Sequence, residues 1–175
     1  AHIPASVVSG LGKLGVLGAC LPREFNGSGL SQVAYCRLIE TLGGHCGSTA
    51  LFVNAHHSIG PRALVLFGTR QQQAKYLPKL ATGEWIGSFC LSEPEAGSDA
   101  TSQRTTAIDM GDHYLLNGTK NWITNGSTAS LHLVMAQTDV EKGHRGINCL
   151  IVEKSWPGVS IGAKDTQTTL KLKNE

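Results

Sequence analysis

Apolar side chains in the N-terminal half of the chain recur at the spacing of amphipathic helices. Val7, Leu11 and Leu14 share one face of a first helix, since residues three and four positions apart lie side by side on a helix. The same spacing continues through the segments that follow. The pattern predicts four helices, beginning near Val7, Ser31, Ser48 and Thr69.

Short polar and glycine signals divide these helices from one another. Ser31 is a candidate N-cap for the second helix, which Gly43-Gly44 is expected to end. Gly60-Pro61 is expected to interrupt the third helix, because proline cannot continue the hydrogen-bond ladder. Thr69 and Gln72 have the spacing of a capping box for the fourth. These signals together predict a compact helical domain.

From Trp85 onward the apolar positions alternate, and β-branched residues and turn signals dominate. Asn117-Gly118 favours a type I′ hairpin turn, whose two central residues need positive φ. Strands without intervening helices favour a small antiparallel β-barrel or sandwich. The chain is therefore predicted to be α+β, with a helical domain at 1–84 and a β domain at 85–175. The expected strands are residues 89–91, 105–108, 114–116, 120–123, 131–136 and 147–152.

Composition and charge narrow the class of protein. Charged residues make up 16% of the 175 positions, against about 25% in ordinary globular proteins. Glycine occupies 21 of the 175 positions, or 12%, against about 7%. This balance excludes a disordered tail and a coiled coil. The formal net charge is +2, without a Lys/Arg cluster, which argues against a nucleic-acid partner. No apolar run reaches the ~18 residues of a membrane-spanning helix, so no transmembrane segment is expected.

The five cysteines are widely spaced and contain no C-x-x-C pair. An odd number without that pair favours reduced thiols over a disulfide framework or a zinc site. Three Asn-Gly-Ser/Thr sequences match a glycosylation sequon but are more simply explained as Asn-Gly turns. No targeting signal is visible at residues 1–8, which leaves a removed one open. We expect a reducing compartment.

Two segments suggest chemistry only weakly. Gly10-Leu-Gly-Lys-Leu-Gly15 matches G-x-G-x-x-G, but its apolar residues have helical spacing and no strand precedes it. We interpret it as small residues that allow close helix packing. His56 and His57 are adjacent and therefore diverge by about 100° on a helix, whereas zinc sites on helices use i, i+4 pairs. We expect packing or polar contacts there, and no metal site.

Residues 88–100, Ser-Phe-Cys-Leu-Ser-Glu-Pro-Glu-Ala-Gly-Ser-Asp-Ala, are more informative. An apolar strand opens into a loop of small residues, whose backbone N–H groups can converge on a phosphate. Gly97 permits close approach of a ligand, and the Ser98 hydroxyl adds a donor. The alternative is a polar loop with an Asx turn at Asp99.

Residues 120–126, Lys-Asn-Trp-Ile-Thr-Asn-Gly, form the second informative segment. Alternation along a strand predicts that Trp122 and Thr124 project from the same face. A flat aromatic surface beside a hydroxyl suits an isoalloxazine ring, with Trp122 against the ring and Thr124 bonded to its polar edge. The alternative is an ordinary barrel tryptophan covered by a loop.

The pairing of S-E-P-x-A-G-S-D with N-W-I-T-N-G resembles the acyl-CoA dehydrogenase family. Residues 14–18 with 21–30, and residues 67–83, are also similar to that family, so the resemblance covers about residues 10–162. Glu95 stands where the family more often has a small residue, and residues 170–175 fit the family only in part. The tail after about residue 162 is therefore either divergent or not native.

The resemblance implies an FAD-dependent enzyme that removes two hydrogens from an acyl-CoA thioester to give the trans-2-enoyl product. Electrons would pass to an electron-transfer flavoprotein, in the mitochondrial matrix or bacterial cytoplasm. The family's C-terminal four-helix domain, which supplies the catalytic base and the core of a tetramer or dimer, is expected to be absent, so we expect this chain to be inactive alone. No catalytic or metal-binding residue is assigned. The implied FAD-binding residues are Phe89, Cys90, Leu91, Ser92, Gly97, Ser98, Trp122, Ile123 and Thr124, and Ser98 is also implied to contact the CoA moiety.

Two other functions are open at this level. A family member recruited as a non-catalytic scaffold or assembly factor would lack the C-terminal glutamate in its full-length form. A small nucleotide-binding module without redox activity would show no yellow colour and no flavin absorbance when purified.

Overall fold

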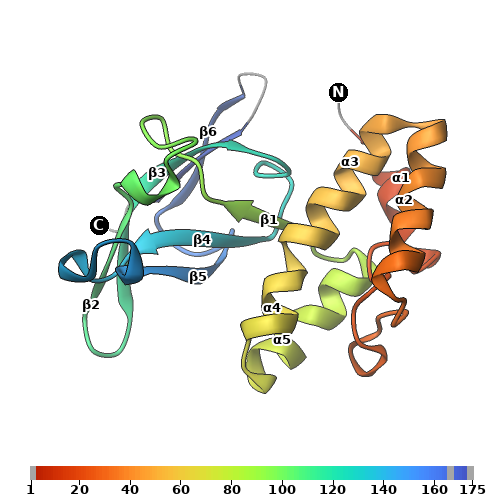
Figure 1. The fold of residues 1–175 in the computed structure, drawn as a ribbon, viewed down its shortest axis with the longest axis horizontal. Coiled ribbons are helices and arrows are strands. Elements are labelled where there is room, and N and C mark those ends of the chain that lie inside the picture. The colour runs from red at the N-terminus through yellow and green to blue at the C-terminus, as the bar shows by residue number, and fades with distance from the viewer. Residues whose placement is uncertain (1–2, 165–167, 173–175) are drawn as a thin grey trace. The chain divides into compact units, whose positions relative to one another are not determined.

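A computed structural model of the chain describes residues 3–164 and 168–172, with side-chain environments for 3–162. The chain forms two compact units, residues 1–87 and 88–175. The first is helical and the second consists mainly of strands (Figure 1), which confirms the α+β class. Part of the tail after residue 162, at residues 165–167 and 173–175, lies outside the described residues. No helix in the described part of the chain is long and apolar enough to cross a membrane.

The helical unit contains α1 (Ala5–Lys13), α2 (Gln32–His45), α3 (Gly47–Asn54), α4 (Pro61–Phe67) and α5 (Arg70–Thr82). The Ser31 side chain caps α2 by accepting a hydrogen bond from the backbone N–H of Ala34. The capping box of Thr69 and Gln72 is present at the start of α5. Two of the predicted signals are therefore confirmed as N-caps.

The structure differs from the predicted helices at two places. The second helix continues through Gly43-Gly44 to His45 and ends at Cys46. The third is interrupted as expected, but by a π-helical turn at Ala55–Ile59 as well as by Gly60-Pro61, so α3 and α4 follow one another as separate helices.

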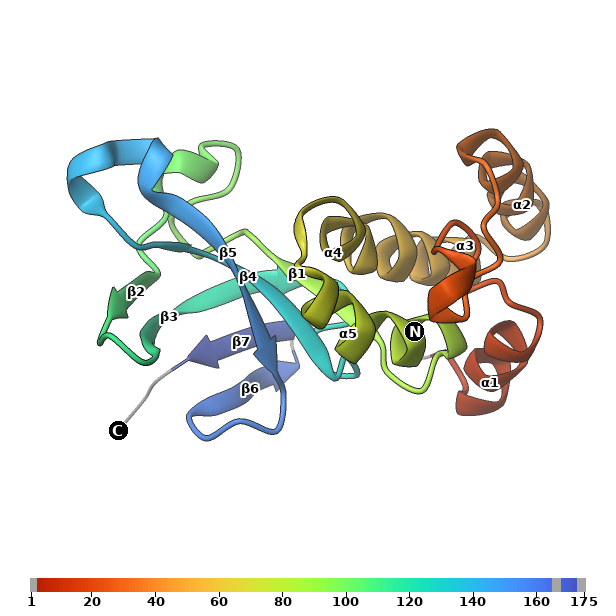
Figure 2. The same ribbon diagram turned by 90° about the horizontal axis from the view of Figure 1, so that it is seen from below.

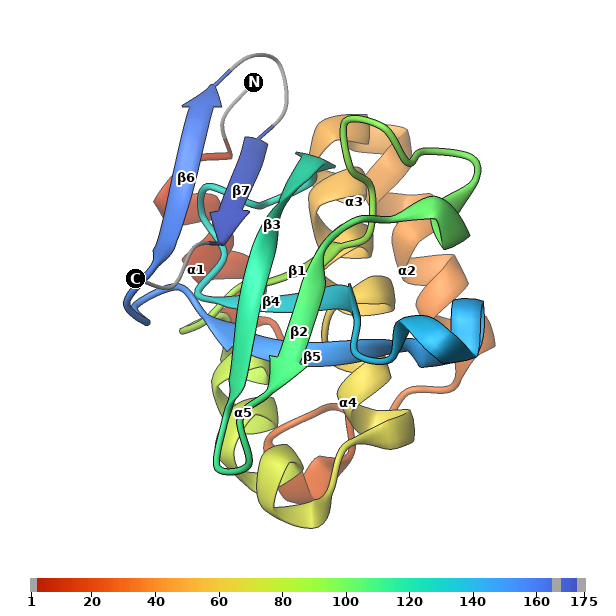
Figure 3. The ribbon, with the colours of Figure 1, turned by 90° about the vertical axis from the view of Figure 1, so that its left-hand side faces the viewer.

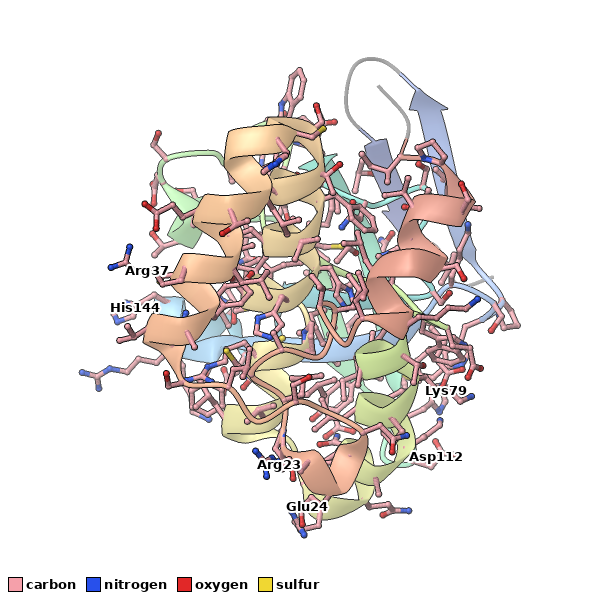
Figure 4. All side chains as sticks on the ribbon, turned by 90° about the vertical axis from the view of Figure 1, so that its right-hand side faces the viewer. Arg23, Glu24, Arg37, Lys79, Asp112 and His144 are labelled. Carbon is pink, nitrogen blue, oxygen red and sulfur yellow. The ribbon has the colours of Figure 1, made fainter. Side chains whose placement is uncertain are left out.

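The interior of the helical unit is filled mainly by leucines and aromatic residues. Leu17, Leu77 and Leu80 are fully buried, and Phe25 and Tyr35 are nearly so. Arg23 and Glu24 extend outward from the turn after α1 (Figure 4), where the Glu24 carboxylate pairs with Arg70 at 2.7 Å. An exposed pair of this kind contributes little to stability, so the apolar interior is the main stabilising feature.

The described residues of the β unit form a seven-stranded sheet. Its strands are β1 (Gly87–Cys90), β2 (Thr106–Asp109), β3 (Tyr114–Ile123), β4 (Leu131–Gln137), β5 (Ile147–Glu153), β6 (Val159–Lys164) and β7 (Thr168–Leu172). They follow the order β1-β4-β2-β3-β7-β6, and β5 also pairs with β4. Figure 3 shows β2, β3, β7 and β6 side by side, with β4 and β5 crossing them; Figure 2 shows the same crossing from below. The small sandwich-like arrangement agrees with the expectation, except that β2 and β4 pair in parallel at Thr106 and Gln137.

Apolar side chains from five strands meet between the crossing layers. Because the strands cross, their inward-facing side chains pack against one another between the layers and exclude water. The cluster consists of Cys90, Ala107, Leu116, Ile123, Val134, Ala136 and Val152.

The hairpin predicted at Asn117-Gly118 is wrong. Both residues lie inside the continuous strand β3, and the chain turns instead between Asp109 and Tyr114. A Cβ on Gly118 would overlap the side chain of Thr105. This glycine therefore permits a close approach across the strands, and its neighbour Asn117 pairs with Thr106 in the regular ladder.

Candidate functional site

The loop that follows β1 exposes its small residues and holds them with a tight turn. Glu93 and Ala96 exchange backbone hydrogen bonds of 2.9 and 3.2 Å, which turns the chain back on itself. Gly97 and Ser98 come next and are exposed. In the described part of the chain, neither of their N–H groups has an acceptor. The arrangement leaves two backbone donors free to bind an anionic group.

The alternative structure for this loop, an Asx turn at Asp99, is also present. The Asp99 carboxylate accepts hydrogen bonds from the N–H and hydroxyl of Thr101 and from the hydroxyl of Ser102. These hydrogen bonds lower the pKa of the Asp99 carboxyl, and the bond from Ser102 has the largest effect, followed by that from Thr101. The loop is therefore closed by Asp99 on one side and by the Glu93–Ala96 turn on the other, with Gly97 and Ser98 between them.

Gly97 has no structural requirement for glycine within this chain. A Cβ built at this position meets nothing within 4 Å, and its φ lies outside the left-handed range. An alanine would therefore fit the protein itself. The missing side chain matters only to a group that approaches the loop from outside.

The second motif segment lies at the end of β3. Trp122 has φ 62°, an uncommon value for a bulky residue, at the point where the pairing of β3 with β7 shifts between Lys120 and Ile123. Its side chain is 56% exposed. Ile123 is buried and Thr124 exposed, although Thr124 lies in the turn after the strand. The expected alternation in exposure is present over these three residues.

Two contacts join the segments that the sequence singled out separately. The backbone N–H of Asn121 donates to the carbonyl of Ser92 at 2.8 Å, and the Lys120 ammonium donates to the carbonyl of Leu91 at 3.0 Å. Because Trp122 directly follows Asn121, its ring and the Ser92 side chain belong to neighbouring backbone segments. The structure thus brings together the end of β1 and the end of β3.

The residues implied to bind FAD divide into buried and accessible groups. The side chains of Cys90 and Ile123 lie in the core cluster, so only their backbone atoms can face a ligand. Phe89, Leu91 and Ser92 are half-buried. Gly97, Ser98, Trp122 and Thr124 are exposed. The accessible group contains the donors and the aromatic ring that a flavin nucleotide requires.

Residues that sequence reasoning missed lie beneath this surface. Lys120 is fully buried and pairs with Glu93 at 2.7 Å. Burial favours a raised pKa for the Glu93 carboxyl, but hydrogen bonds from Lys120 and Thr105 bring that pKa below its usual value. Burial also lowers the pKa of Lys120, while Glu93 opposes this shift. A signal existed in the sequence, because Lys120 shares the inward face of β3 with Leu116 and Gly118.

The two weak sequence candidates have structural roles. The G-x-G-x-x-G segment begins in α1, where a Cβ on Gly12 would overlap the Thr82 carbonyl. His56 contacts the Leu80 carbonyl at 3.1 Å and the Gly87 N–H at 3.1 Å. His57 accepts from the Cys20 N–H at 2.9 Å and stacks on a neighbouring tyrosine ring. Packing and polar contacts at these segments are therefore confirmed.

A separate apolar hollow lies at the opposite end of β3. It has a volume of about 360 Å³ and is lined by residues that include Tyr114, Leu150 and Trp156. Seven residues of β3 lie between Tyr114, at its start, and Trp122, near its end, a span of roughly 25 Å. None of the residues implied to bind FAD lines this hollow.

Comparison with known proteins accounts for nearly the whole chain. Residues 1–84 match the family model of the acyl-CoA dehydrogenase N-terminal domain, and residues 88–173 match that of the middle domain. The very long-chain specific acyl-CoA dehydrogenase of Macaca fascicularis is 40% identical over 179 residues, covering 98% of this chain and 27% of the relative. The short-chain specific acyl-CoA dehydrogenase of Clostridium acetobutylicum is 40% identical over 161 residues, covering 92% and 42%. The chain thus spans less than half the length of these relatives.

Solved structures also resemble the chain in fold over nearly its whole length. A Bacillus anthracis acyl-CoA dehydrogenase complexed with FAD matches with TM-score 0.88 and 38% identity, covering 96% of this chain and 30% of that one. A structure described as the electron transferring flavoprotein of Acidaminococcus fermentans matches with TM-score 0.93 and 36% identity, covering 97% and 47%. Sequence and fold agree, and the chain belongs to the acyl-CoA dehydrogenase family.

Proposed function

We propose that the β unit binds FAD at the joined ends of β1 and β3, and that the chain is the N-terminal and middle part of an acyl-CoA dehydrogenase. The observation that carries this proposal is the hydrogen bond from Asn121 to Ser92. It places a ring-sized aromatic surface and a hydroxyl on adjacent segments. The similarity to an acyl-CoA dehydrogenase complexed with FAD supports the same assignment.

The residues present fit the cofactor. The free N–H groups of Gly97 and Ser98 suit the pyrophosphate, since such donors favour anions. Ser92 would hydrogen-bond the polar edge of the isoalloxazine, Trp122 would pack against it, and Thr124 would add a second hydroxyl. The cofactor would also contact backbone atoms of Cys90 and Ile123. It would contact the accessible parts of the half-buried residues Phe89 and Leu91. Ser98 would also contact the CoA moiety of the substrate.

When bound, the flavin would accept the β-hydrogen of the acyl group as hydride. The chain's own part is to hold and orient the ring, and to exclude water from one side of it with Trp122. Neither glutamate in the motif is proposed as the base for the α-proton. Both carboxylate oxygens of Glu93 accept hydrogen bonds, and Glu95 forms an exposed ion pair with Arg104.

The wider activity rests on the family. We propose dehydrogenation of acyl-CoA thioesters, with electron-transfer flavoprotein as the acceptor and a tetramer or dimer as the assembled enzyme. The catalytic base would come from the part of the relatives that this chain does not span, and this chain alone would not turn over substrate. Mitochondrial or bacterial location is proposed on the same grounds.

Titration of the purified chain with FAD and with ADP tests the proposal. FAD is expected to bind at least tenfold more tightly than ADP, because Ser92, Trp122 and Thr124 contact only the flavin half. Bound flavin should also shift its visible absorption bands. Equal affinities for FAD and ADP would show that the site contacts only the ADP half of FAD, as expected for a non-redox nucleotide-binding module. Absence of binding of either compound would contradict the proposed site.

A further inference from the structure

Beneath the proposed FAD site lies a fully buried ammonium with three partners. The Nζ of Lys120 donates to the Leu91 carbonyl at 3.0 Å, to Glu93 Oε1 at 2.7 Å and to Gln103 Oε1 at 2.9 Å. A lysine ammonium has three donors, so all of them are used. Lys120, Glu93 and Gln103 are called the Lys120 cluster below.

The Lys120 cluster holds both ends of the loop that carries Gly97 and Ser98. At the start of the loop, Lys120 binds the Leu91 carbonyl and the Glu93 carboxylate. At its end, Gln103 is the third acceptor, and the Glu93 carboxylate also accepts from the backbone N–H groups of Arg104 and Thr105. One buried cation therefore fixes the chain on both sides of the exposed residues.

Stability of the fold does not explain this arrangement. Burying two charges costs desolvation that their attraction barely returns, and apolar replacement of a buried ion pair is often neutral or stabilising. The apolar cluster of the β unit already joins β1 to β5 without Lys120. The segment that the Lys120 ammonium contacts is the chain after Cys90, where β1 ends and the backbone leaves the regular strand.

We propose that the Lys120 cluster is a positioning device for FAD. It sets the place of Ser92, Gly97 and Ser98 relative to Trp122, while its own side chains remain covered and do not touch the cofactor. This inference rests on the proposed function. It adds that flavin affinity depends on a buried ion pair, although neither Lys120 nor Glu93 is among the residues implied to bind FAD.

The test replaces the ion pair with neutral side chains of similar size, as the double variant Lys120→Met/Glu93→Gln. The control is Lys154→Met, because Lys154 also donates to a backbone carbonyl, that of Ser127 at 2.8 Å, but is exposed. Urea unfolding, FAD titration and amide hydrogen exchange are measured on each protein. Gln103→Met serves if the double variant fails to fold, because it keeps the ion pair. It removes the third acceptor of Lys120 together with the hydrogen bond from Gln103 Nε2 to the Ala100 carbonyl.

The double variant is expected to unfold near the wild-type urea concentration, bind FAD at least tenfold more weakly and alter the visible spectrum of bound flavin. Without FAD, the amides of Asn121 and Thr105 should exchange at least tenfold faster, while those of β4 and β5 keep their rates. Gln103→Met should show the same changes at smaller size. Lys154→Met should match wild type throughout.

Wild-type FAD affinity and flavin spectrum in a folded double variant would overturn the inference. If the wild-type chain itself binds no FAD, the proposed function fails, and hydrogen exchange still decides whether the cluster positions the loop. Unchanged exchange at Asn121 and Thr105 would then overturn the positioning role as well.

Discussion

Single residues in the two motif segments divide between those that hold the fold and those that face outward. Cys90 and Ile123 fill the core, while Trp122, two residues from the buried Lys120, stands exposed on a left-handed backbone. Holding a bulky residue in that conformation costs about 1–2 kcal/mol. An exposed indole held at such a cost is consistent with a contact surface for a flat ligand.

Gly97→Ala tests the outward-facing part of the loop. The new methyl meets nothing in the protein, so the free energy of unfolding should change by less than about 0.5 kcal/mol. FAD affinity should fall about tenfold, because the methyl occupies the approach to the two free N–H groups. Isothermal titration measures the affinity, and Gly47→Ala, whose Cβ is also unobstructed, is the control. Unaltered FAD affinity in Gly97→Ala would remove this loop from the site.

Among the elements, helices α1 and α5 show why a nucleotide motif can be misleading. Gly10 and Gly12 belong to the same G-x-G-x-x-G match, yet only Gly12 faces the Thr82 carbonyl closely. The segment is a helix at this point and not a strand followed by a turn. The close packing against Thr82 therefore explains the glycine at position 12, and no bound nucleotide is needed to explain it.

Gly12→Ala and Gly10→Ala are expected to have opposite effects on stability. The Gly12 methyl would collide with backbone, which should cost about 1–3 kcal/mol. The Gly10 methyl enters open space on a helix, where alanine is favoured over glycine by roughly 0.5–1 kcal/mol. Thermal and urea unfolding of the two variants measure the difference. Equal effects would show that α1 does not pack closely against the end of α5.

Elements marked by local interactions could be predicted from the sequence, and those decided by distant contacts could not. The Ser31 cap and the Thr69 capping box depend on residues within one turn. Asn117-Gly118 has the letters of a hairpin, but Gly118 is required by Thr105 across the strands. The same limit applies to the site, where the motif letters identify Ser92 and Trp122 but their joining depends on Lys120 and Asn121.

The stability of the whole chain is expected to depend on pH, because three histidines are buried. Burial lowers the pKa of His56, His57 and His132 from about 6.5 to about 4. The unfolded chain therefore binds protons between pH 6.5 and 4 that the folded chain does not. The free energy of unfolding therefore has its full value above about pH 6.5. It falls as the pH drops toward 4, by up to about 3 kcal/mol per histidine.

Urea unfolding at several pH values between 7.5 and 4 checks this dependence. His132→Asn should flatten it, since His132 is fully buried and contacts Ser88 at 2.7 Å through Nδ1. His144→Asn, at an exposed position, should leave the slope as in the wild type. An unchanged slope in His132→Asn would assign the loss of stability in acid to other groups.

If FAD binds where Trp122 and Ser92 meet, FAD titration of Trp122→Ala should detect the loss of the indole ring. Trp156→Ala is the matched control, because Trp156 is also a partly exposed tryptophan of the β unit but lines the separate apolar hollow. Trp122→Ala should lose at least tenfold in FAD affinity while Trp156→Ala keeps the wild-type value. Wild-type FAD affinity in a folded Trp122→Ala protein would contradict the assignment.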